Sequence, residues 1–496
     1  MHDNLKSMDY IFNPRSIAFI GATEAIGKWG FIIMNNIMSG GYDGDIYPVN
    51  PGRDKVLGLK TYPSVLDIPG DVDLALFTVP ARFIPSALDD CVKKGVKASV
   101  VISAGFRELG GDAVDLEKEM VDKAKAAGMV LVGPNGQGIC CPRNDLYVWM
   151  PNFYPPSGRI AVVSQSGNIQ NMMIGGAVRA GFGVSKSVSS GNEAVLKIED
   201  YYSYLAEDPD TDVILSYIES IVDGRRFIEH ARRVSADKPI IVLKGGRTRS
   251  GVAAASSHTG AMSVSDDLFD AVCRQANIVR IDTIEEAGVV AASFINRPLP
   301  RGNRVGIITG GGGLGVIASD MLSGRGLDVV TLSEETLDKI GKHMPAWWVP
   351  GNPVDMVAGL NFGSLGPIME ILMQSGEIDS LVAMFIGPPN IEGTRTPKKE
   401  GRGIDISKHW DSTMNQLGSH AEELYGLMHD LSVPVFMVAN IRREDGLTCM
   451  GDNPKIRTNY FTSIDSACRA VSAMTTYAKR VQSKRGEKDV ASTASK

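Results

Sequence analysis

The sequence predicts an α/β protein built from doubly wound, mostly parallel sheets. Apolar runs typical of buried strands alternate with stretches of helical character, and three of these runs end in a turn of glycine or small residues before a helix. The three turns lie at residues 21–28, 164–167 and 310–315. Because 496 residues exceed what one core usually holds, we expect about three domains.

The composition argues against several classes of protein. The sequence has no run of about 18 apolar residues, and its polar start at 1–13 has no signal-peptide core. Its six scattered cysteines suit reduced thiols, with neither a zinc nor a disulfide framework. The net charge of -6 gives no case for nucleic acid. We therefore expect a cytoplasmic protein with no nucleic-acid or membrane partner and no metal of its own.

The first domain, expected over residues 1–150, begins with a β-rich run at 16–22. Further strands are expected at 45–49, 73–79, 98–103 and 129–132, with helices at 31–38, 84–94 and 113–127. The turn after the first strand is not a P-loop, because five residues separate Gly21 from Gly27 and Trp29 follows Lys28. Its backbone N–H groups, helix start and nearby lysine still suit an anion, so the residues alone allow any adenine-containing ligand.

The second turn consists of Ser164, Gln165, Ser166 and Gly167, with a helix expected from Asn168. The two serines can cap that helix. The partial positive charge and free N–H groups of the helix N-terminus can also hold a phosphoryl group. The two roles are compatible, and the second domain is expected over 151–298.

The third turn holds four consecutive glycines at 310–313, between a strand and a helix expected at 315–323. It indicates either another nucleotide site or a turn packed against a neighbouring domain, and we favour the second. Strand character at 379–386 and 433–438 completes a third domain over 299–480. A polar insertion or surface loop is expected at 388–429, and a disordered tail at 481–496.

A histidine lies in a run of small residues at 256–262, shortly after a predicted strand at 239–243. Held there, the imidazole of His258 could move between two sites, although an ordinary solvent-exposed or capping histidine fits the spacing too. Glu219 ends the apolar run 213–218, at the carboxyl end of a predicted strand. Its carboxylate could orient His258, or could simply be exposed at the strand end.

Several short motifs occur in a fixed order between residues 190 and 284. They are Ser-Gly-Asn at 190–192, Tyr-Leu-Ala-Glu-Asp-Pro at 204–209, Tyr-Ile-Glu at 217–219, Asp-Gly-Arg at 223–225, Leu-Lys-Gly-Gly-Arg at 243–247 and Ser-Ser-His-Thr-Gly-Ala at 256–261. This order resembles the alpha subunit of the NDP-forming acyl-CoA synthetases, relatives of succinyl-CoA synthetase. The resemblance covers roughly residues 10–390.

The resemblance implies a Rossmann-like CoA-binding domain followed by two flavodoxin-like domains. It places CoA contacts in the loops at the strand ends, namely Gly21, Ala22, Thr23, Gly27, Lys28, Asn50, Pro51, Lys55, Val79, Pro80, Ala104, Gly105 and Asn135. The sequence departs from the family at the thiol end. The family commonly has a cysteine after Gly-Pro-Asn, and this chain has Gly-Gln-Gly at 136–138.

The resemblance also implies a reaction. Acid, CoA and ATP would give acyl-CoA, ADP and phosphate reversibly, through an acyl phosphate and a phosphohistidine at His258. Glu219 would contact the histidine, and residues 164–167 would hold the phosphate. A neutral imidazole suits this task, because it is nucleophilic near pH 7 and forms a labile phosphoramidate. No ATP-grasp segment or P-loop is found, so we expect a separate ATP-grasp beta subunit to hold ATP or ADP with Mg²⁺, in an α2β2 assembly.

Two other functions remain open from the residues. A catalytically silent CoA-binding regulator or scaffold needs no His258, Glu219 or serine turn. A nicotinamide-dependent dehydrogenase needs an acidic residue about 20 residues after the first turn, and Asp43 and Asp45 lie near that spacing. The acyl group is not specified, since the tryptophan pair at 347–348 can line an acyl pocket, pack in a core or be exposed.

Overall fold

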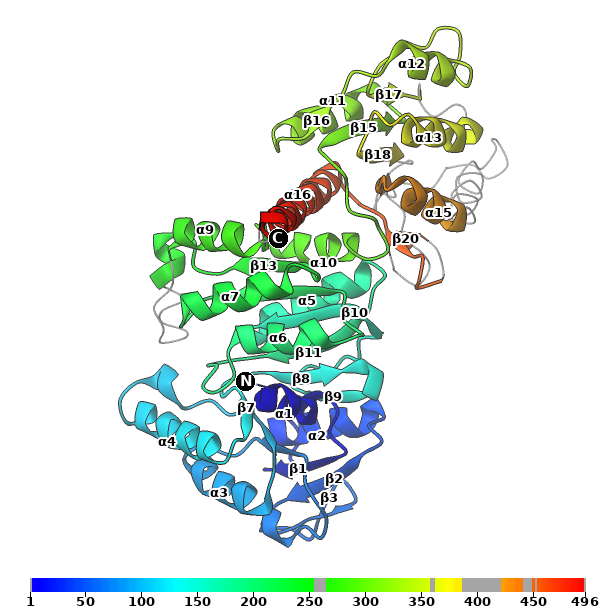
Figure 1. The fold of residues 1–496 in the computed structure, drawn as a ribbon. Coiled ribbons are helices and arrows are strands. Elements are labelled where there is room, and N and C mark those ends of the chain that lie inside the picture. Colours follow the sequence, from blue (N-terminus) through cyan, green and yellow to red (C-terminus); the bar gives the residue numbers. More distant parts are fainter. Residues whose placement is uncertain are drawn as a thin grey trace, which may run out of the picture. The chain divides into compact units, whose positions relative to one another are not determined.

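The computed structural model describes residues 2–253, 265–356, 362–385, 421–439, 448–450 and 453–494. His258, with the rest of its small-residue loop, lies outside these ranges, as do residues 388–420 of the predicted insertion. The chain forms two compact units (Figure 1). The first comprises Met1–Val178 and Phe182–Gly288, and the second comprises Arg179–Gly181 and Val289–Lys496.

The first unit begins with a five-stranded parallel sheet in the order β2-β1-β5-β6-β7. Its elements are α1 (His2–Phe12), β1 (Ser16–Ile20), α2 (Trp29–Gly40), β2 (Asp45–Val49), β3 (Lys55–Val56), β4 (Leu59–Lys60), β5 (Leu74–Phe77), α3 (Ile84–Lys94), β6 (Ala98–Val101), α4 (Asp112–Ala126) and β7 (Val130–Val132). The strand order reverses between β1 and β5, and in open α/β sheets ligands bind at the carboxyl ends of the strands beside such a point.

Alternate residues of β1 pack on opposite faces of this sheet. Ile17 and Phe19 lie in one cluster with the apolar side chains of α1 and α2, whereas Ala18 and Ile20 lie in another with those of α3 and α4. Helices therefore cover both faces (Figure 1). A parallel strand covered on both faces needs an unbroken apolar run, which explains why the sequence at 16–20 is apolar without alternation.

The same unit contains a seven-stranded sheet in the order β14-β13-β12-β10-β11-β8-β9. Its elements are β8 (Gly138–Cys141), β9 (Leu146–Trp149), β10 (Ser157–Ser164), α5 (Gly167–Arg179), β11 (Val184–Ser189), α6 (Ile198–Glu207), β12 (Val213–Ile218), α7 (Gly224–Val234), β13 (Ile240–Lys244), α9 (Asp266–Ala276) and β14 (Val279–Ile281). Here the order reverses between β10 and β12, so residues 164–167 and Glu219 follow the two strands at the switch point.

The strands β8 and β9 run antiparallel at the edge of this second sheet. The hydrogen-bonded sheets therefore divide between β7 and β8, earlier than the predicted domain boundary at 150/151. One apolar cluster spans both sheets and includes Phe12 of α1 and Tyr204 of α6, whose rings stack with centroids 5.4 Å apart. This shared core fixes one sheet against the other within the first unit.

A buried ion pair joins β11 to the loop after α6. Lys186 Nζ donates to Asp208 Oδ1 at 2.8 Å, and each side chain is only 5% exposed. Thr211 Oγ1 donates to the other carboxylate oxygen. Burial alone would raise the pKa of Asp208, but these hydrogen bonds and the lysine charge lower it below its usual value.

The second unit holds a parallel sheet in the order β16-β15-β18-β19, with β17 pairing to β15. Its elements are α10 (Ile284–Ser293, beginning in the first unit), β15 (Arg304–Thr309), α11 (Gly312–Ser323), β16 (Asp328–Val329), α12 (Glu334–Gly341), β17 (Val354–Asp355), α13 (Leu365–Gln374), β18 (Ser380–Phe385), α15 (Ala421–Leu431), β19 (Val435–Ala439), β20 (Cys449–Met450), β21 (Thr458–Asn459) and α16 (Ile464–Ala494).

Two stretches of this unit differ from expectation. Residues 421–429, predicted within a polar loop, lie in α15, because Leu424, Met428 and Leu431 recur at helical spacing and pack on the core. The backbone of α16 is helical through Ala494, where a disordered tail was predicted at 481–496. That stretch has no proline and several good helix formers, and these outweigh its polarity.

The third glycine turn is open rather than tightly packed. A Cβ added at Gly311 or Gly313 would meet nothing within 4 Å, whereas one at Gly315 would lie 2.9 Å from Pro353 in the same unit. A Cβ at Gly312 would lie 3.1 Å from Asp355 Oδ2, also in this unit, so the close contacts of the turn are internal and its packing against a neighbouring domain stays a prediction. Trp348 is buried in the core of this unit, and Trp347 is exposed.

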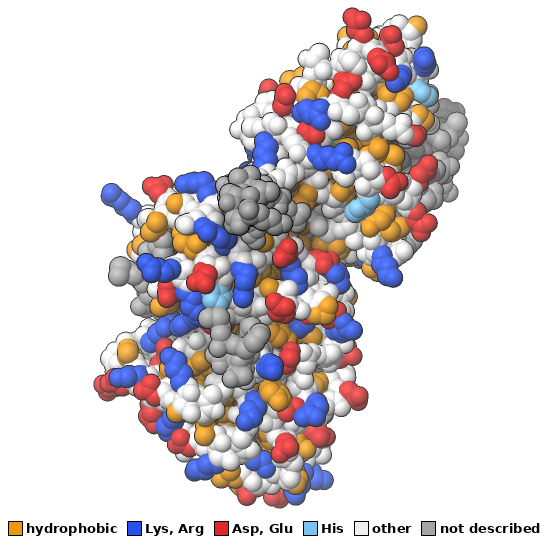
Figure 2. Space-filling model, in the orientation of Figure 1, with side chains coloured by type: hydrophobic (Ala, Val, Ile, Leu, Met, Phe, Trp, Pro, Cys, Tyr) orange, Lys and Arg blue, Asp and Glu red, His pale blue; other side chains and the backbone are white. Residues whose placement is uncertain are grey.

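Charged side chains of both signs are interspersed on the face of the molecule in Figure 2. In the part of the chain that the structure describes, no helix is long and apolar enough to cross a membrane. The six cysteines are all buried, and none of them forms a disulfide. Among the described residues, His, Cys, Asp and Glu side chains form no group of three that could hold a metal ion.

Candidate functional site

The first turn brings the backbone of β1 close to β5. Gly21 has φ +97°, and a Cβ there would lie 2.6 Å from Thr78 Oγ1. Ala22 is buried, and its carbonyl accepts a hydrogen bond from Asn50 Nδ2 at 2.9 Å. Gly27 and Lys28 are exposed at the start of α2, where Lys28 is the N-cap residue without a side-chain cap. The turn thus leaves free N–H groups and a lysine at the edge of the first sheet.

Replacing Gly21 by alanine tests this close approach. We expect the free energy of unfolding to fall by about 3 kcal/mol, because alanine adds both positive-φ strain and a clash with Thr78. Gly27→Ala is the matched control, since Gly27 has φ +89° but nothing within 4 Å of a Cβ, and should cost only about 1 kcal/mol. Urea unfolding of the two variants measures the difference, and equal losses would contradict it.

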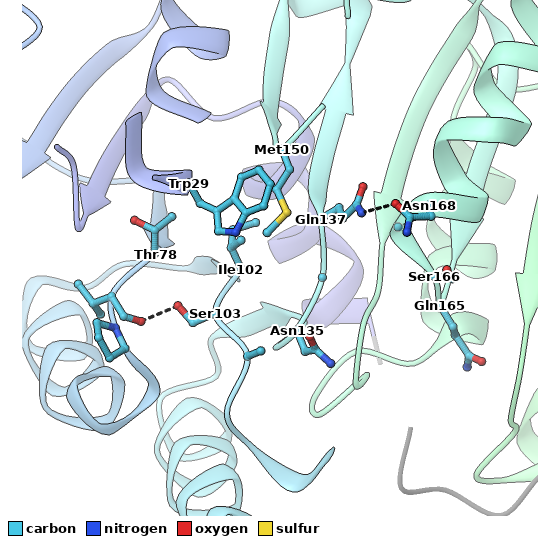
Figure 3. Close-up of a pocket in the computed structure, with 15 residues that line it drawn as sticks. Trp29, Thr78, Ile102, Ser103, Asn135, Gln137, Met150, Gln165, Ser166 and Asn168 are labelled. Carbon is cyan, nitrogen blue, oxygen red and sulfur yellow. Dashed lines mark hydrogen bonds between the residues drawn. The ribbon is translucent and has the colours of Figure 1, made fainter. Parts of the chain in front are cut away.

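A cavity of about 520 Å³ lies where the loops of the two sheets meet within the first unit (Figure 3). Seven of its lining residues were predicted from the sequence. Val79, Pro80, Ala104 and Asn135 come from the loops of the first sheet, and Gln165, Ser166 and Gly167 come from the turn after β10. Ser103 Oγ donates to the Val79 carbonyl at 2.5 Å and so joins two of the loops. The cavity thus connects the predicted CoA loops to the predicted phosphate turn.

The other predicted residues do not line this cavity. Gly21, Ala22 and Thr23 lie beside it through Thr78, whose hydroxyl donates to the carbonyl of Gly21 at 3.3 Å. Asn50, Pro51 and Lys55 follow or begin strands at the β2 side of the sheet, and Gly105 adjoins Ala104. These loops extend the cavity edge along the carboxyl ends of the first sheet.

The turn after β10 is held by its own serine and glutamine. Ser164 is fully buried, and its Oγ accepts the Ser166 N–H at 3.1 Å and donates to the Ser166 carbonyl. Gln165 Oε1 accepts the N–H groups of Glu219 and Ser220 at 2.7 and 3.0 Å. The side chain of Gln165 therefore ties this turn to the end of β12 across the switch point, a role that the sequence did not indicate.

Glu219 is buried rather than exposed at its strand end. Its side chain hydrogen-bonds Tyr217, and burial together with this carboxylate raises the pKa of the tyrosine. Its carbonyl accepts from Lys244 Nζ at 3.0 Å, and burial lowers the pKa of that lysine. The expected contact with His258 lies outside the described residues, so it stays a prediction.

The buried carboxyl of Glu193 lies close to the turn at 164–167 and was not predicted from the sequence. Glu193 Oε1 accepts from Ser190 Oγ at 2.7 Å, and the Ser190 N–H donates to the Ser164 carbonyl at 2.8 Å. Burial raises the pKa of Glu193 to about 7, although hydrogen bonds from Ser190 and Gln165 oppose the shift. The sequence signal was weak, because a glutamate after Gly-Asn is usually exposed in a turn.

Replacing Glu193 by glutamine should flatten the pH dependence of stability. The folded-state pKa of about 7 exceeds the usual 4.5. Between these values the folded chain holds a proton that the unfolded chain has released, so the free energy of unfolding falls as the pH rises, by up to about 1.4 kcal/mol per pH unit. Urea unfolding from pH 5 to 8 measures the slope. Glu370→Gln, at an exposed site in α13, is the control, and an unchanged slope in Glu193→Gln would contradict the assignment.

Several further residues line the cavity without having been predicted, among them Trp29, Met150 and Gln137. Trp29 follows Lys28 at the start of α2, Met150 follows β9, and Gln137 lies in the segment that departs from the family. Of these three, only Gln137 carried a sequence signal, since it lies in the Gly-Gln-Gly segment that stands where the family commonly has a cysteine after Gly-Pro-Asn. In contrast, the tryptophan pair at 347–348 does not line this cavity.

The geometry disfavours a dinucleotide site. β2 runs parallel to β1, and Asp45 pairs with Ser16 at the amino end of the strands. The ribose-binding carboxylate of a dehydrogenase belongs at the carboxyl end of β2, beside the glycine turn. That end carries Val49 and Asn50, so Asp43 and Asp45 lie at the wrong edge of the sheet.

Comparisons with known proteins agree with this architecture. Residues 15–142 match a CoA binding domain, residues 157–294 a succinyl-CoA ligase like flavodoxin domain, and residues 305–389 a ligase-CoA domain. The alpha subunit of acetate–CoA ligase [ADP-forming] II from Pyrococcus furiosus is 39% identical over 395 residues, which are 79% of this chain and 86% of the relative.

Two further matches extend over nearly all of the chain. A trans-feruloyl-CoA synthase from an unknown prokaryotic organism is 31% identical over 96% of this chain and 65% of its own length. The structure of a dinucleotide-forming acetyl-coenzyme A synthetase 1 from Candidatus Korarchaeum cryptofilum, in complex with phosphate and ADP, matches with a TM-score of 0.81 and 30% identity over 96% of this chain and 97% of that one. The chain therefore belongs to the family of ADP-forming acyl-CoA ligases, of the alpha-subunit type.

Proposed function

We propose that this chain forms and consumes an acyl phosphate in the cavity between its first two sheets, and passes the phosphoryl group through His258. The observation that carries the proposal is the cavity itself, because it opens on both the predicted CoA loops and the turn at residues 164–167. A scaffold that only binds CoA does not need the turn at residues 164–167 on the other side of the cavity.

The residues present fit CoA and phosphate. The loops at Val79, Pro80, Ala104 and Asn135 offer small side chains and backbone groups along which a pantetheine arm can lie. At the far wall, Gly167 begins α5, whose free N–H groups and partial positive charge favour an anion. Thiol and phosphate would therefore meet in one cavity.

The reaction balances in three steps, each reversible. A phosphate oxygen attacks the thioester carbonyl, the C–S bond breaks, and the thiolate takes up a proton to give CoA. An imidazole nitrogen of His258 then attacks phosphorus, and the P–O bond to the acyl oxygen breaks to release the carboxylate. Transfer of the phosphoryl group to ADP restores the imidazole.

The nucleotide step would take place on a partner. We infer that a separate ATP-grasp beta subunit holds ADP or ATP with Mg²⁺, in an α2β2 assembly, because the predicted domains of this chain include no such segment. The naming of relatives as alpha subunits supports a partner. The carboxylic acid is proposed only as a class, since relatives are named for acetate, 4-hydroxybutyrate and ferulate.

Intact-protein mass spectrometry tests the proposal. The chain is incubated with inorganic phosphate and acetyl-CoA, or with feruloyl-CoA, and separately with ATP alone. We expect an acid-labile gain of one phosphoryl group with an acyl-CoA and phosphate, and none with ATP until a beta subunit is added. Bound CoA without label under every condition would instead identify a catalytically silent CoA-binding protein, and label from ATP alone would remove the need for a partner.

A further inference from the structure

The cavity has no charged side chain among its described lining residues. Its polar groups are the hydroxyls of Thr78, Ser103 and Ser166, the indole N–H of Trp29, the side-chain amides of Asn135, Gln137, Gln165 and Asn168, and backbone groups. Arg or Lys side chains ordinarily bind an anion. In this cavity, neutral hydrogen-bond donors must therefore provide more of the binding. Neutral donors stabilise an anion only when they are fixed to point at it, which makes the orientation of each amide important.

Gln137 is rigidly placed against the start of α5. Its side chain lies over Gly167, where any Cβ would overlap it. Its carbonyl accepts the Met150 N–H at 2.9 Å, and a Cβ on the preceding Gly136 would lie 2.5 Å from the Ser189 carbonyl oxygen. The glycines at 136 and 167 therefore allow the Gln137 side chain to lie between the β8 loop and the phosphate turn.

The amides of three residues form a directed chain. Asn171 Nδ2 donates to Gln137 Oε1 at 2.9 Å, and Gln137 Nε2 donates to Asn168 Oδ1 at 3.0 Å. In Figure 3, Gln137 and Asn168 point toward one another beside Ser166. Asn168 lies in the first turn of α5 and lines the cavity. Its side-chain oxygen accepts the hydrogen bond from Gln137, so its amide nitrogen points away from Gln137.

We propose that Gln137 is a positioning residue for the transferred phosphoryl group: it fixes the Asn168 amide so that Nδ2 donates to an oxygen of phosphate or acyl phosphate. This inference rests on the proposed function and names two further residues of that site. Asn168 Nδ2 would add one donor to the free N–H groups at the start of α5. It would therefore reinforce the partial positive charge that this helix N-terminus presents to an anion. Asn168 belongs to α5, away from the predicted CoA loops. Gln137 follows the predicted CoA contact Asn135, but its amide is directed toward α5, so we expect neither side chain to contribute to CoA binding.

A double-mutant cycle on the full-length chain tests the proposal. The variants are Gln137→Met, Asn168→Ala and both together, with Gln374→Met at an exposed site of α13 as the matched control. Methionine keeps the length and packing of Gln137 but cannot donate or accept these hydrogen bonds. The readouts are the phosphate concentration for half-maximal phosphorylation with acetyl-CoA or feruloyl-CoA, the Kd for CoA, and the melting temperature.

Each single variant should raise the half-maximal phosphate concentration about 10-fold, and the double variant should raise it no further, because Gln137 acts through Asn168. The Kd for CoA and the melting temperature should stay within twofold and about 2 °C of wild type. Additive effects, or an unchanged phosphate dependence, would overturn the proposal, as would a weaker CoA affinity with a lower melting temperature. A wild-type chain that takes no label would instead remove the proposed function, and this inference with it.

Discussion

Replacing His258 by alanine is expected to abolish phosphorylation of the chain and to lower steady-state acyl-CoA formation with the beta subunit by at least about 10³-fold. In the proposed reaction the imidazole of His258 is the nucleophile that takes the phosphoryl group from the acyl phosphate to the nucleotide, and the substitution removes it. The Kd for CoA should not change, because the predicted CoA loops belong to other strands. Mass spectrometry and a coupled assay measure the two effects.

His343→Ala is the matched control, since His343 is an exposed histidine of the second unit and should leave turnover unchanged. Glu219→Gln adds a graded test, because loss of an orienting carboxylate typically costs less than loss of the nucleophile. We expect it to retain some label but to lower the rate. Full turnover in His258→Ala would show that the phosphoryl group bypasses this histidine.

Replacing Asp208 by asparagine is expected to destabilise the first unit by about 3–5 kcal/mol. Asp208 and Lys186 are each 5% exposed, and the change leaves a buried ammonium without its counter-charge. Removing both charges, in Lys186→Met with Asp208→Leu, should cost much less, because apolar groups of similar volume need no partner. Urea unfolding of the single and double variants measures the difference.

An exposed ion pair is the control for this prediction. Lys339 and Glu335 lie one turn apart on α12 and are 54% and 80% exposed, so Lys339→Ala should cost less than about 1 kcal/mol. The pH dependence gives an independent check. The lowered folded-state pKa of Asp208 means that its stabilisation is present at neutral pH and is lost as the pH falls through that value, below the usual 3.8. A double variant as unstable as Asp208→Asn would contradict the ion-pair account.

The strands and turns of the first two sheets could be predicted from the sequence because their physics is local. A strand buried on both faces requires an apolar run, and the turn after it requires small residues, so residues 16–22 and 159–167 indicate strand-turn-helix units without any tertiary contact. The ends of long polar segments were less predictable. The helix α15 depends on apolar residues spaced among charges, and these show their role only when packed on the core.

The candidate site was predictable only in part, for a physical reason. The turn at 164–167 and the loop at 79–80 follow strands at sheet switch points, and the loop at 104–105 follows the neighbouring strand β6, so topology places all three near a ligand. Gln137, Trp29 and Met150 reach the cavity from separate segments, and no sequence spacing brings them together. The burial of Glu193, which raises its pKa to about 7, likewise depends on surrounding elements rather than on its neighbours in the chain.

By itself, the sequence determined the α/β class, the three turns and the resemblance that names His258 as the phosphoryl carrier. These features depend on which residue types stand a few positions apart, because the conformational freedom of glycine and the periodicity of apolar residues are both local properties of the chain. The tertiary structure alone decided that two sheets share one core, that their loops enclose a cavity without charged walls among the described residues, and that Gln137 lies over Gly167. Packing between distant segments sets these distances, because burial and amide orientation are properties of the assembled fold.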